Sequence, residues 1–189
     1  MSFEQLVICH CAPVLRGIKI SNLVSCSKQD FPFAKSEAEN LNRRFEPFGL
    51  KCSVLCECKN FSLIFVYDCR KLENFLSEHD NREYLESVGY SCVSTEYMLS
   101  ELAQRINGHK EFPHEIGSFL GYPIEDVVGF TRNHGANFKY SGYGKVYGDI
   151  RKAKALFASF DLCSRKCSKL AMNGFSVEEV INNADLQSA

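Results

Sequence analysis

Apolar residues recur at helical spacing through much of the chain. Ala38, Leu41 and Phe45 repeat every three or four positions between residues 34 and 46, and Gly49 follows as a helix stop. The same spacing predicts six further helices, at 70–78, 81–88, 95–107, 114–120, 124–133 and 150–172. A last short helix is predicted after Ser176, which forms a capping-box pattern with Glu179.

Other segments repeat with a period of two, which is typical of strands. Alternating apolar positions predict a strand at 50–58, and the continuous apolar run at 61–67 predicts a central strand that is covered on both faces. Strands are also predicted at 18–24 and 138–147, whereas the apolar segment 6–15 is predicted as a loop or short helix.

These elements predict an α+β fold. We expect a small, mostly antiparallel sheet of about four strands packed with helices. At 189 residues the chain is long enough for one domain, predicted at 1–175, and residues 176–189 are predicted as a short helix and a polar tail.

Charge and hydropathy indicate where the protein is located and which classes of partner it does not bind. Twenty-two basic against 23 acidic residues leave a net charge of -1, so we expect no binding to nucleic acid and no attraction to an anionic membrane. The chain has no apolar run of roughly 18 residues and no signal-peptide pattern, so a cytoplasmic location is expected. The ten cysteines are therefore expected to be reduced and packed as small apolar groups.

A cysteine and a histidine suggest one kind of chemistry. Cys11 would act as a nucleophile, His114 as its base, and Glu115 or Asp149 as the group that orients the imidazole, because only a thiolate attacks. In the alternative interpretation, His114 and Glu115 are ordinary residues of a helix start and Cys11 is a packed side chain.

Paired cysteines also raise the question of a metal. The pairs are Cys9 with Cys11, Cys56 with Cys58, and Cys163 with Cys167. Structural zinc sites usually contain C-x2-C spacing, which this sequence lacks, and each pair is explained equally well by packing. We therefore predict no metal ligands and leave the cofactor unknown.

The predicted strand at 138–147 carries the best binding feature. Its alternation places Lys139, Tyr143, Lys145 and Tyr147 on one face. Rings that stack and ammonium groups that attract anions would suit a nucleotide, a flavin or another anionic aromatic molecule. The alternative is an exposed sheet face whose tyrosines are cross-strand pairs.

Three sequence motifs together resemble those of a known family. The first is His10-Cys11-Ala12-Pro13, and the second runs from Pro113-His114-Glu115-Ile116-Gly117 to Gly121-Tyr122-Pro123. The third runs from Gly142-Tyr143 to Gly148-Asp149. The chain resembles, over nearly its whole length, an uncharacterised family of bacterial proteins of unknown function that is common in anaerobes. The resemblance implies iron or redox physiology and a flavodoxin-like redox partner. His10 and Arg16, at the first motif, are further candidates for ligand binding.

Three functions remain open at this point. The first is a small-ligand or cofactor-binding protein that takes an anionic aromatic ligand. The second is a thiol-dependent hydrolase or transferase that uses Cys11 and His114. The third is a protein–protein adaptor without either chemistry.

Overall fold

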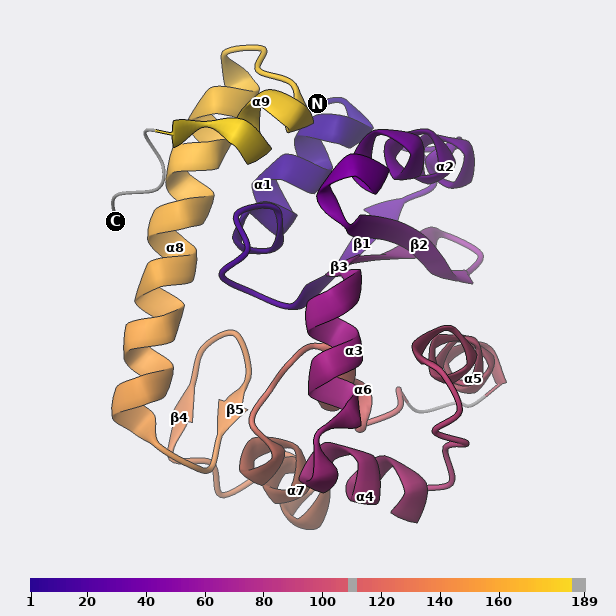
Figure 1. Ribbon diagram of the computed structural model, residues 1–189, viewed down its shortest axis with the longest axis vertical. Helices are drawn as coiled ribbons and strands as arrows, with labels where there is room; N and C mark the ends of the chain where they lie inside the picture. Colours follow the sequence, from indigo (N-terminus) through magenta and orange to yellow (C-terminus); the bar gives the residue numbers. More distant parts are fainter. Residues whose placement is uncertain (109–111, 185–189) are drawn as a thin grey trace. The chain divides into compact units, whose positions relative to one another are not determined.

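The computed structural model describes residues 1–108 and 112–184, and it has the predicted α+β composition (Figure 1). Contacts within the chain define two compact units. Unit 1 contains residues 1–69 together with the C-terminal part from residue 159, and unit 2 contains residues 70–158.

Unit 1 is built on a three-stranded antiparallel sheet. Its strands are β1 (Ser21–Ser27), β2 (Leu50–Glu57) and β3 (Phe61–Asp68), in the order β1-β3-β2. The central position of β3 confirms the prediction from its continuous apolar run, because both faces of this strand are buried. The strand predicted at 18–24 begins later, at Ser21, after a turn in which Gly17 takes a positive φ of 70°.

Helices cover one face of this sheet. They are α1 (Phe3–Leu15), α2 (Ala34–Phe45), the short 3-10 helix η1 (Glu46–Phe48), the end of α8 (Ile150–Met172) and α9 (Val177–Asn182). Side chains from α1 and α2, including Ile8 and Phe45, form a common core with Ile64 of β3. The hydrophobic effect of burying this face is the main stabilisation of the unit.

The first helix is longer than the sequence predicted. Residues 3–15 form a full helix, started by a capping box between Ser2 and Gln5 and carrying Pro13 in its last turn. Nine of its side chains are buried, so apolar residues occur around most of its circumference and the usual one-sided pattern is missing. For this reason the sequence left a loop or a short helix open at 6–15; the helical alternative is right, but the helix is longer than predicted.

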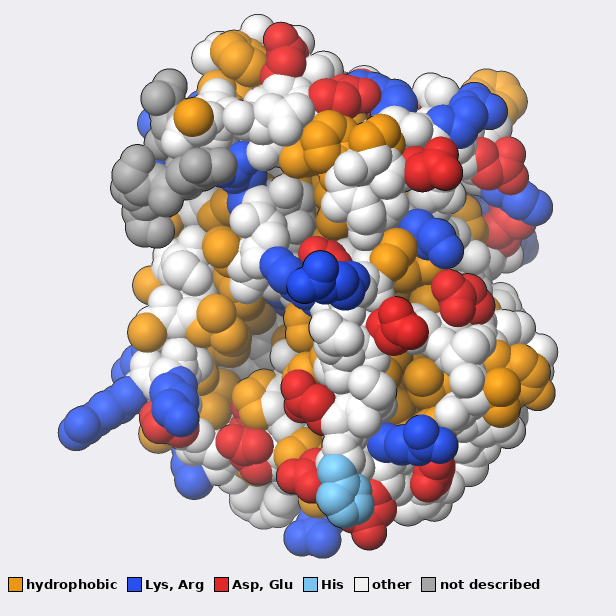
Figure 2. All heavy atoms as spheres, viewed as in Figure 1, with side chains coloured by type: hydrophobic (Ala, Val, Ile, Leu, Met, Phe, Trp, Pro, Cys, Tyr) orange, Lys and Arg blue, Asp and Glu red, His pale blue; other side chains and the backbone are white. Residues whose placement is uncertain are grey.

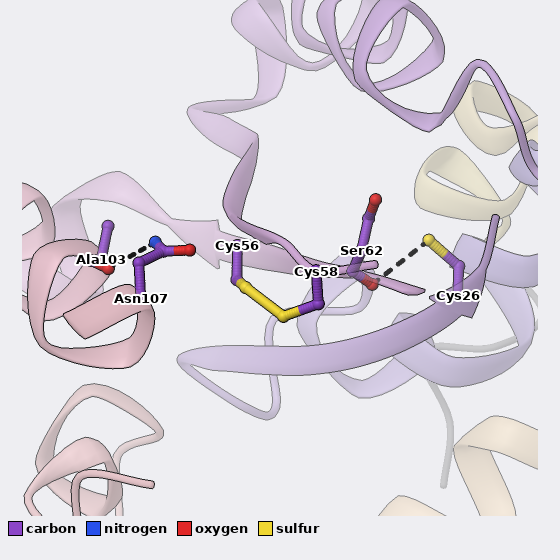
Figure 3. The surroundings of a disulfide bond; sticks show 6 residues. All are labelled: Cys26, Cys56, Cys58, Ser62, Ala103 and Asn107. Atoms are coloured by element: carbon purple, nitrogen blue, oxygen red, sulfur yellow. Dashed lines mark hydrogen bonds between the residues drawn. A yellow bond between two sulfur atoms is a disulfide. The ribbon is translucent and has the colours of Figure 1, made fainter. Parts of the chain in front are cut away.

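Two of the ten cysteines are joined, contrary to the expectation that all are reduced. Cys56 and Cys58 form a disulfide, with Cα atoms 5.9 Å apart (Figure 3). A bulge between Val54 and Cys56 interrupts the alternation of β2, so the regular one-face pattern predicted for residues 50–58 ends at Val54. The other eight cysteines are free.

Unit 2 is mostly helical. Its elements are α3 (Cys69–Ser77), α4 (His79–Ser87), α5 (Thr95–Gly108), α6 (Ile116–Phe119), α7 (Ile124–Asn133), β4 (Tyr140–Ser141), β5 (Lys145–Val146) and the start of α8. Most of the helices follow the predicted ranges closely, but the helix predicted at 114–120 is shortened to Ile116–Phe119 and His114 precedes it. Their buried side chains include Leu72, Leu85, Leu102 and Phe119.

The predicted strand at 138–147 is instead a tight hairpin. Tyr140 pairs with Val146 and Ser141 with Lys145, and the chain reverses at 142–144. The hairpin forms its own two-stranded sheet, so the larger sheet has three strands rather than about four. Gly142 and Gly144 lie at the two ends of the reversal. Glycines favour a turn there, which the alternating pattern did not predict.

Charged side chains of both signs are interspersed over the face that Figure 2 shows, in keeping with the net charge of -1. Among residues 1–108 and 112–184, no helix is long and apolar enough to cross a bilayer.

Candidate functional site

A cavity of about 800 Å³ lies within unit 2. Its wall comes from the segment around α6, from α7 and from the β4–β5 hairpin. The apolar part of the wall includes Ile116, Val127 and Phe130, and the polar part includes His114, His134 and Lys145. The volume falls in the range of small-molecule sites, which are mostly apolar and carry a few convergent polar groups.

His114 reaches the cavity from a turn that precedes α6. The turn is closed by the Ile116 N–H, which donates to the Pro113 carbonyl at 3.2 Å. The exposed imidazole lies edge-on to the Phe130 ring of α7, with ring centroids 5.1 Å apart. Phe130 therefore packs against the imidazole, and both residues line the cavity.

The tip of the hairpin forms another part of the wall. Tyr143 stands at the reversal, 39% exposed, with its ring 5.4 Å from that of Phe157. The Tyr122 hydroxyl donates to the Tyr143 carbonyl at 2.7 Å. Gly142 is required for this packing, because a Cβ there would lie 2.4 Å from a Phe157 ring carbon.

Lys145 supplies the cationic group of the wall. Its Nζ donates to the Ser141 hydroxyl at 3.2 Å and lies 3.8 Å from the centre of the Phe138 ring. Both contacts are of the modest kind found at exposed sites, so a ligand anion would compete for the ammonium group.

The other two members of the predicted binding face have different roles. Among the described residues that line the cavity, Lys139 and Tyr147 do not occur. The Lys139 ammonium donates to the Gly148 carbonyl at 3.3 Å, and the Tyr147 hydroxyl donates to the Ala136 carbonyl at 2.8 Å. The face assigned from alternation is therefore corrected, because the chain reverses within it.

Asp126 is a residue that the sequence interpretation missed. It lies in the first turn of α7, and its Oδ1 accepts the backbone N–H groups of Tyr147 at 2.6 Å and Gly148 at 2.8 Å. A buried carboxylate with two N–H donors is well satisfied, so Asp126 fixes the hairpin to α7 and keeps the cavity wall in place. No local motif marked it, since acidic residues are common in the first turn of a helix.

Comparison with known proteins gives a family for the chain. A family model described as "Protein of unknown function (DUF3793)" matches residues 7–181. The chain belongs to this family. No curated protein and no solved structure matches it. The resemblance to a family of unknown function is thus confirmed, while the bacterial and anaerobic distribution stays a prediction.

In this member of the family, Cys11 is packed inside unit 1. The thiol is 0% exposed, and burial raises its pKa to about 12 despite the nearby Lys19 charge. A thiol with such a pKa is protonated at neutral pH, so its environment opposes the role of nucleophile. Cys11 belongs to unit 1 and His114 to unit 2.

The two carboxylates proposed to orient His114 are engaged elsewhere. Glu115 accepts from the Arg105 guanidinium at 2.9 Å and from the Tyr90 hydroxyl at 3.2 Å. Asp149 accepts the backbone N–H groups of Lys152 and Arg151, and these bonds lower its pKa. Asp149 thus caps the start of α8, and neither residue contributes to a triad with His114.

The two ligand-binding candidates near the N-terminus, Arg16 and His10, make contacts within unit 1. Arg16 donates to the carbonyls of Val180, at 3.0 Å, and Ile181, both in α9. His10 is exposed, and its carbonyl accepts from the Asn22 side chain at 2.8 Å. His114, Tyr143 and Lys145 are thus the predicted residues that share one cavity, whereas His10, Cys11 and Arg16 belong to the other unit.

Thiol reactivity offers a direct check. The pKa of the half-buried Cys163 is lowered by a hydrogen bond from Cys167 and by the charges of Arg16 and Lys166. In native protein at pH 7.5, we expect iodoacetamide to label Cys163 and to leave Cys11 and Cys52 unlabelled until denaturant is added. Peptide mapping measures each site, and labelling of native Cys11 as fast as Cys163 would contradict this account.

Proposed function

We propose that unit 2 binds a small anionic aromatic molecule, such as a nucleotide or a flavin, in the cavity between α7 and the β4–β5 hairpin. The observation that carries the proposal is that His114 lines the same cavity as Tyr143 and Lys145 of the hairpin, although about thirty residues separate it from them in sequence. A ring system would lie against the aromatic and aliphatic wall, and its anionic group would lie near the Lys145 ammonium and the two imidazoles.

The hydrogen bonds that hold the cavity wall support ligand binding. Its wall is held by the Asp126 carboxylate and by the Tyr122 hydroxyl, both bonded to the backbone of the hairpin. These bonds leave Tyr143 with an exposed ring and Lys145 with weak internal contacts. A preformed wall with such side chains loses little conformational entropy when a ligand binds.

Titration with flavin mononucleotide and with adenosine monophosphate tests the proposal. We expect saturable binding of at least one probe, followed by flavin fluorescence or by calorimetry. Tyr143→Ala and Lys145→Ala should each weaken it about tenfold, roughly 1.4 kcal/mol, through lost stacking and lost charge attraction. Lys139→Ala is the matched control, because it removes an equal charge from the same hairpin outside the cavity.

Two further readouts decide the interpretation. Affinity should fall only modestly as salt rises, since one or two cationic groups are involved rather than a row of phosphate contacts. Tyr143→Ala should leave the melting temperature nearly unchanged because the ring is 39% exposed. If this variant instead loses the roughly 3 to 5 kcal/mol of a core aromatic truncation, the ring is structural and the hairpin is not the site.

A further inference from the structure

The Cys56–Cys58 disulfide lies at an edge of the unit 1 sheet. Strand β2 is one of the two outer strands in the order β1-β3-β2, and a bulge precedes Cys56 near the end of this strand. Figure 3 shows the bond between Cys56 and Cys58. Cys56 is 3% exposed, whereas Cys58 lies beyond the last residue of the strand and is half-buried. Of the two bonded residues, Cys58 is therefore the more exposed.

This bond is poorly suited to be a structural staple. It encloses a single residue, Glu57, and the entropy that a disulfide removes from the unfolded chain is smallest for the shortest loops. Pairing of β2 with β3 already holds the strand that carries Cys56, from Leu50 to Glu57. The fold would be retained with both thiols reduced.

The other eight cysteines also favour a redox role for the pair over a structural one. Eight are free, and four of these, Cys9, Cys69, Cys92 and Cys163, are half-buried rather than sealed in the core. Accessible free thiols are typical of proteins kept in a reducing environment, where disulfides that do form are usually transient and catalytic or sensing.

From the loop size, the edge position and the unequal exposure, we propose that Cys56 and Cys58 are a redox-active pair that exchanges with an external thiol. The site shares no residue with the cavity of unit 2, so it is independent of the proposed ligand binding.

The unequal exposure sets the order of the exchange. An external thiolate attacks Cys58 Sγ, the Cys56–Cys58 bond breaks, and its electron pair leaves on Cys56 Sγ, which takes up a proton. A second external thiolate then attacks the external sulfur of the mixed disulfide and releases Cys58 as a thiolate, which is protonated in turn. In sum, two external thiols become one disulfide, and the pair gains two electrons and two protons; oxidation is the reverse.

The unmodified full-length protein supplies the first test. After equilibration in glutathione buffers of varied composition, free thiols are alkylated under denaturing conditions and counted by mass. We expect a reversible change between eight and ten labelled cysteines, with the two additional labels at residues 56 and 58. A count that never changes with the buffer would overturn the proposal, whether it stays at eight or at ten.

Variants in which one cysteine of the pair is replaced test the order of attack. Cys56→Ser, incubated with oxidised glutathione, should collect a glutathione adduct at Cys58 at least tenfold faster than Cys58→Ser collects one at the buried Cys56. The half-buried Cys69 serves as an internal comparison in both variants. Equal rates at Cys56 and Cys58, or an adduct at Cys69 as fast as at Cys58, would contradict the proposed entry point.

The source of the thiol is distinguished by comparing reductants. Wild-type protein is reduced in parallel with glutathione and with a thioredoxin-class dithiol protein at matched thiol concentration. Faster reduction by the dithiol protein assigns a protein partner, and faster reduction by glutathione assigns a small thiol. Reduction by neither while the fold is native would overturn the proposal.

Discussion

Arg44→Met should destabilise unit 1 by about 3 kcal/mol at neutral pH, because one guanidinium joins three helices. Arg44 of α2 bonds to Glu4 of α1, at 2.7 and 3.0 Å, and to Glu178 of α9, at 2.5 Å through two nitrogens. These side chains are about 30% exposed, so water screens the pairs only in part. Removing the cation leaves two carboxylates near each other without their common partner.

The pH dependence of this loss follows from the two carboxyl groups. Hydrogen bonds from Arg44 lower the pKa of Glu178 to about 2 and lower the pKa of Glu4 as well. A carboxyl whose pKa is depressed by folding stabilises the protein above its unfolded pKa, near 4.5, and the stabilisation is lost as pH falls through the folded value. The difference between wild type and Arg44→Met should thus be full above pH 5 and shrink towards pH 2.

Urea unfolding at several pH values measures the effect. Arg43→Met is the matched control, since Arg43 is the neighbouring residue of α2 but is exposed and bonds only to Asn40 among the contacts the structure gives it. We expect the control to change the free energy of unfolding by less than about 0.5 kcal/mol. Equal losses for the two variants would mean that the ion-pair network contributes little.

Much of the fold could be predicted because periodicity reports which face of an element is buried. The helices at 70–78, 95–107 and 150–172 each place an apolar stripe on one side, and the structure has helices there. The central strand at 61–67 was recognisable for the opposite reason, since it has no polar side at all. Residues 3–15 are also apolar around most of the helix, and there the same feature concealed a helix rather than revealing a strand.

The candidate site was predicted only in part. Tyr143 and Lys145 were singled out by the alternation of a predicted strand, and His114 as a possible base for Cys11; the structure places all three on the wall of one cavity. Their actual neighbours Phe130, Asp126 and Tyr122 act through contacts between segments, and no local pattern marks such contacts. The reversal at 142–144 also changed which side chains share a wall, so Lys139 and Tyr147 were wrongly grouped with Tyr143.

The first motif illustrates how a chemically suggestive sequence can be structural. Cys11 is a reactive residue type and Arg16 a common anion-binding type, yet Cys11 is buried in the core and Arg16 donates to the carbonyls of α9. Sequence alone cannot separate a buried thiol from an activated one, because the two differ in hydration and neighbouring charge rather than in spacing.

Lys19→Met should stabilise the protein at pH 7 by about 3 kcal/mol, because it removes a buried ammonium group. The Lys19 side chain is 7% exposed, and its Nζ donates to Asn22 Oδ1 at 2.5 Å. Burial lowers the pKa of Lys19 from 10.5 to about 8, so the folded state holds the ammonium less favourably than water does. A shift of this size corresponds to about 3 kcal/mol, since each pKa unit is worth about 1.4 kcal/mol.

The sign of the pH dependence distinguishes this effect from simple better packing. Between pH 8 and 10.5 the unfolded chain holds the Lys19 proton while the folded protein has released it, so wild-type stability gains from rising pH over this range. The advantage of Lys19→Met should therefore be full below pH 8 and nearly absent above pH 10.5. Comparing the two proteins at each pH cancels the titration of groups that they share.

Chemical unfolding of wild type and Lys19→Met between pH 7 and 10.5 measures both statements. Lys28→Met is a suitable control, because Lys28 is a partly exposed lysine of the same unit and should give a small difference that does not vary with pH. A Lys19→Met advantage that stays constant across the range would assign the gain to packing. No advantage at pH 7 would mean that the neighbours of Lys19 stabilise its buried ammonium group as much as water stabilises it in the unfolded chain. Lys19 would then be a structural cation of unit 1 rather than a source of instability.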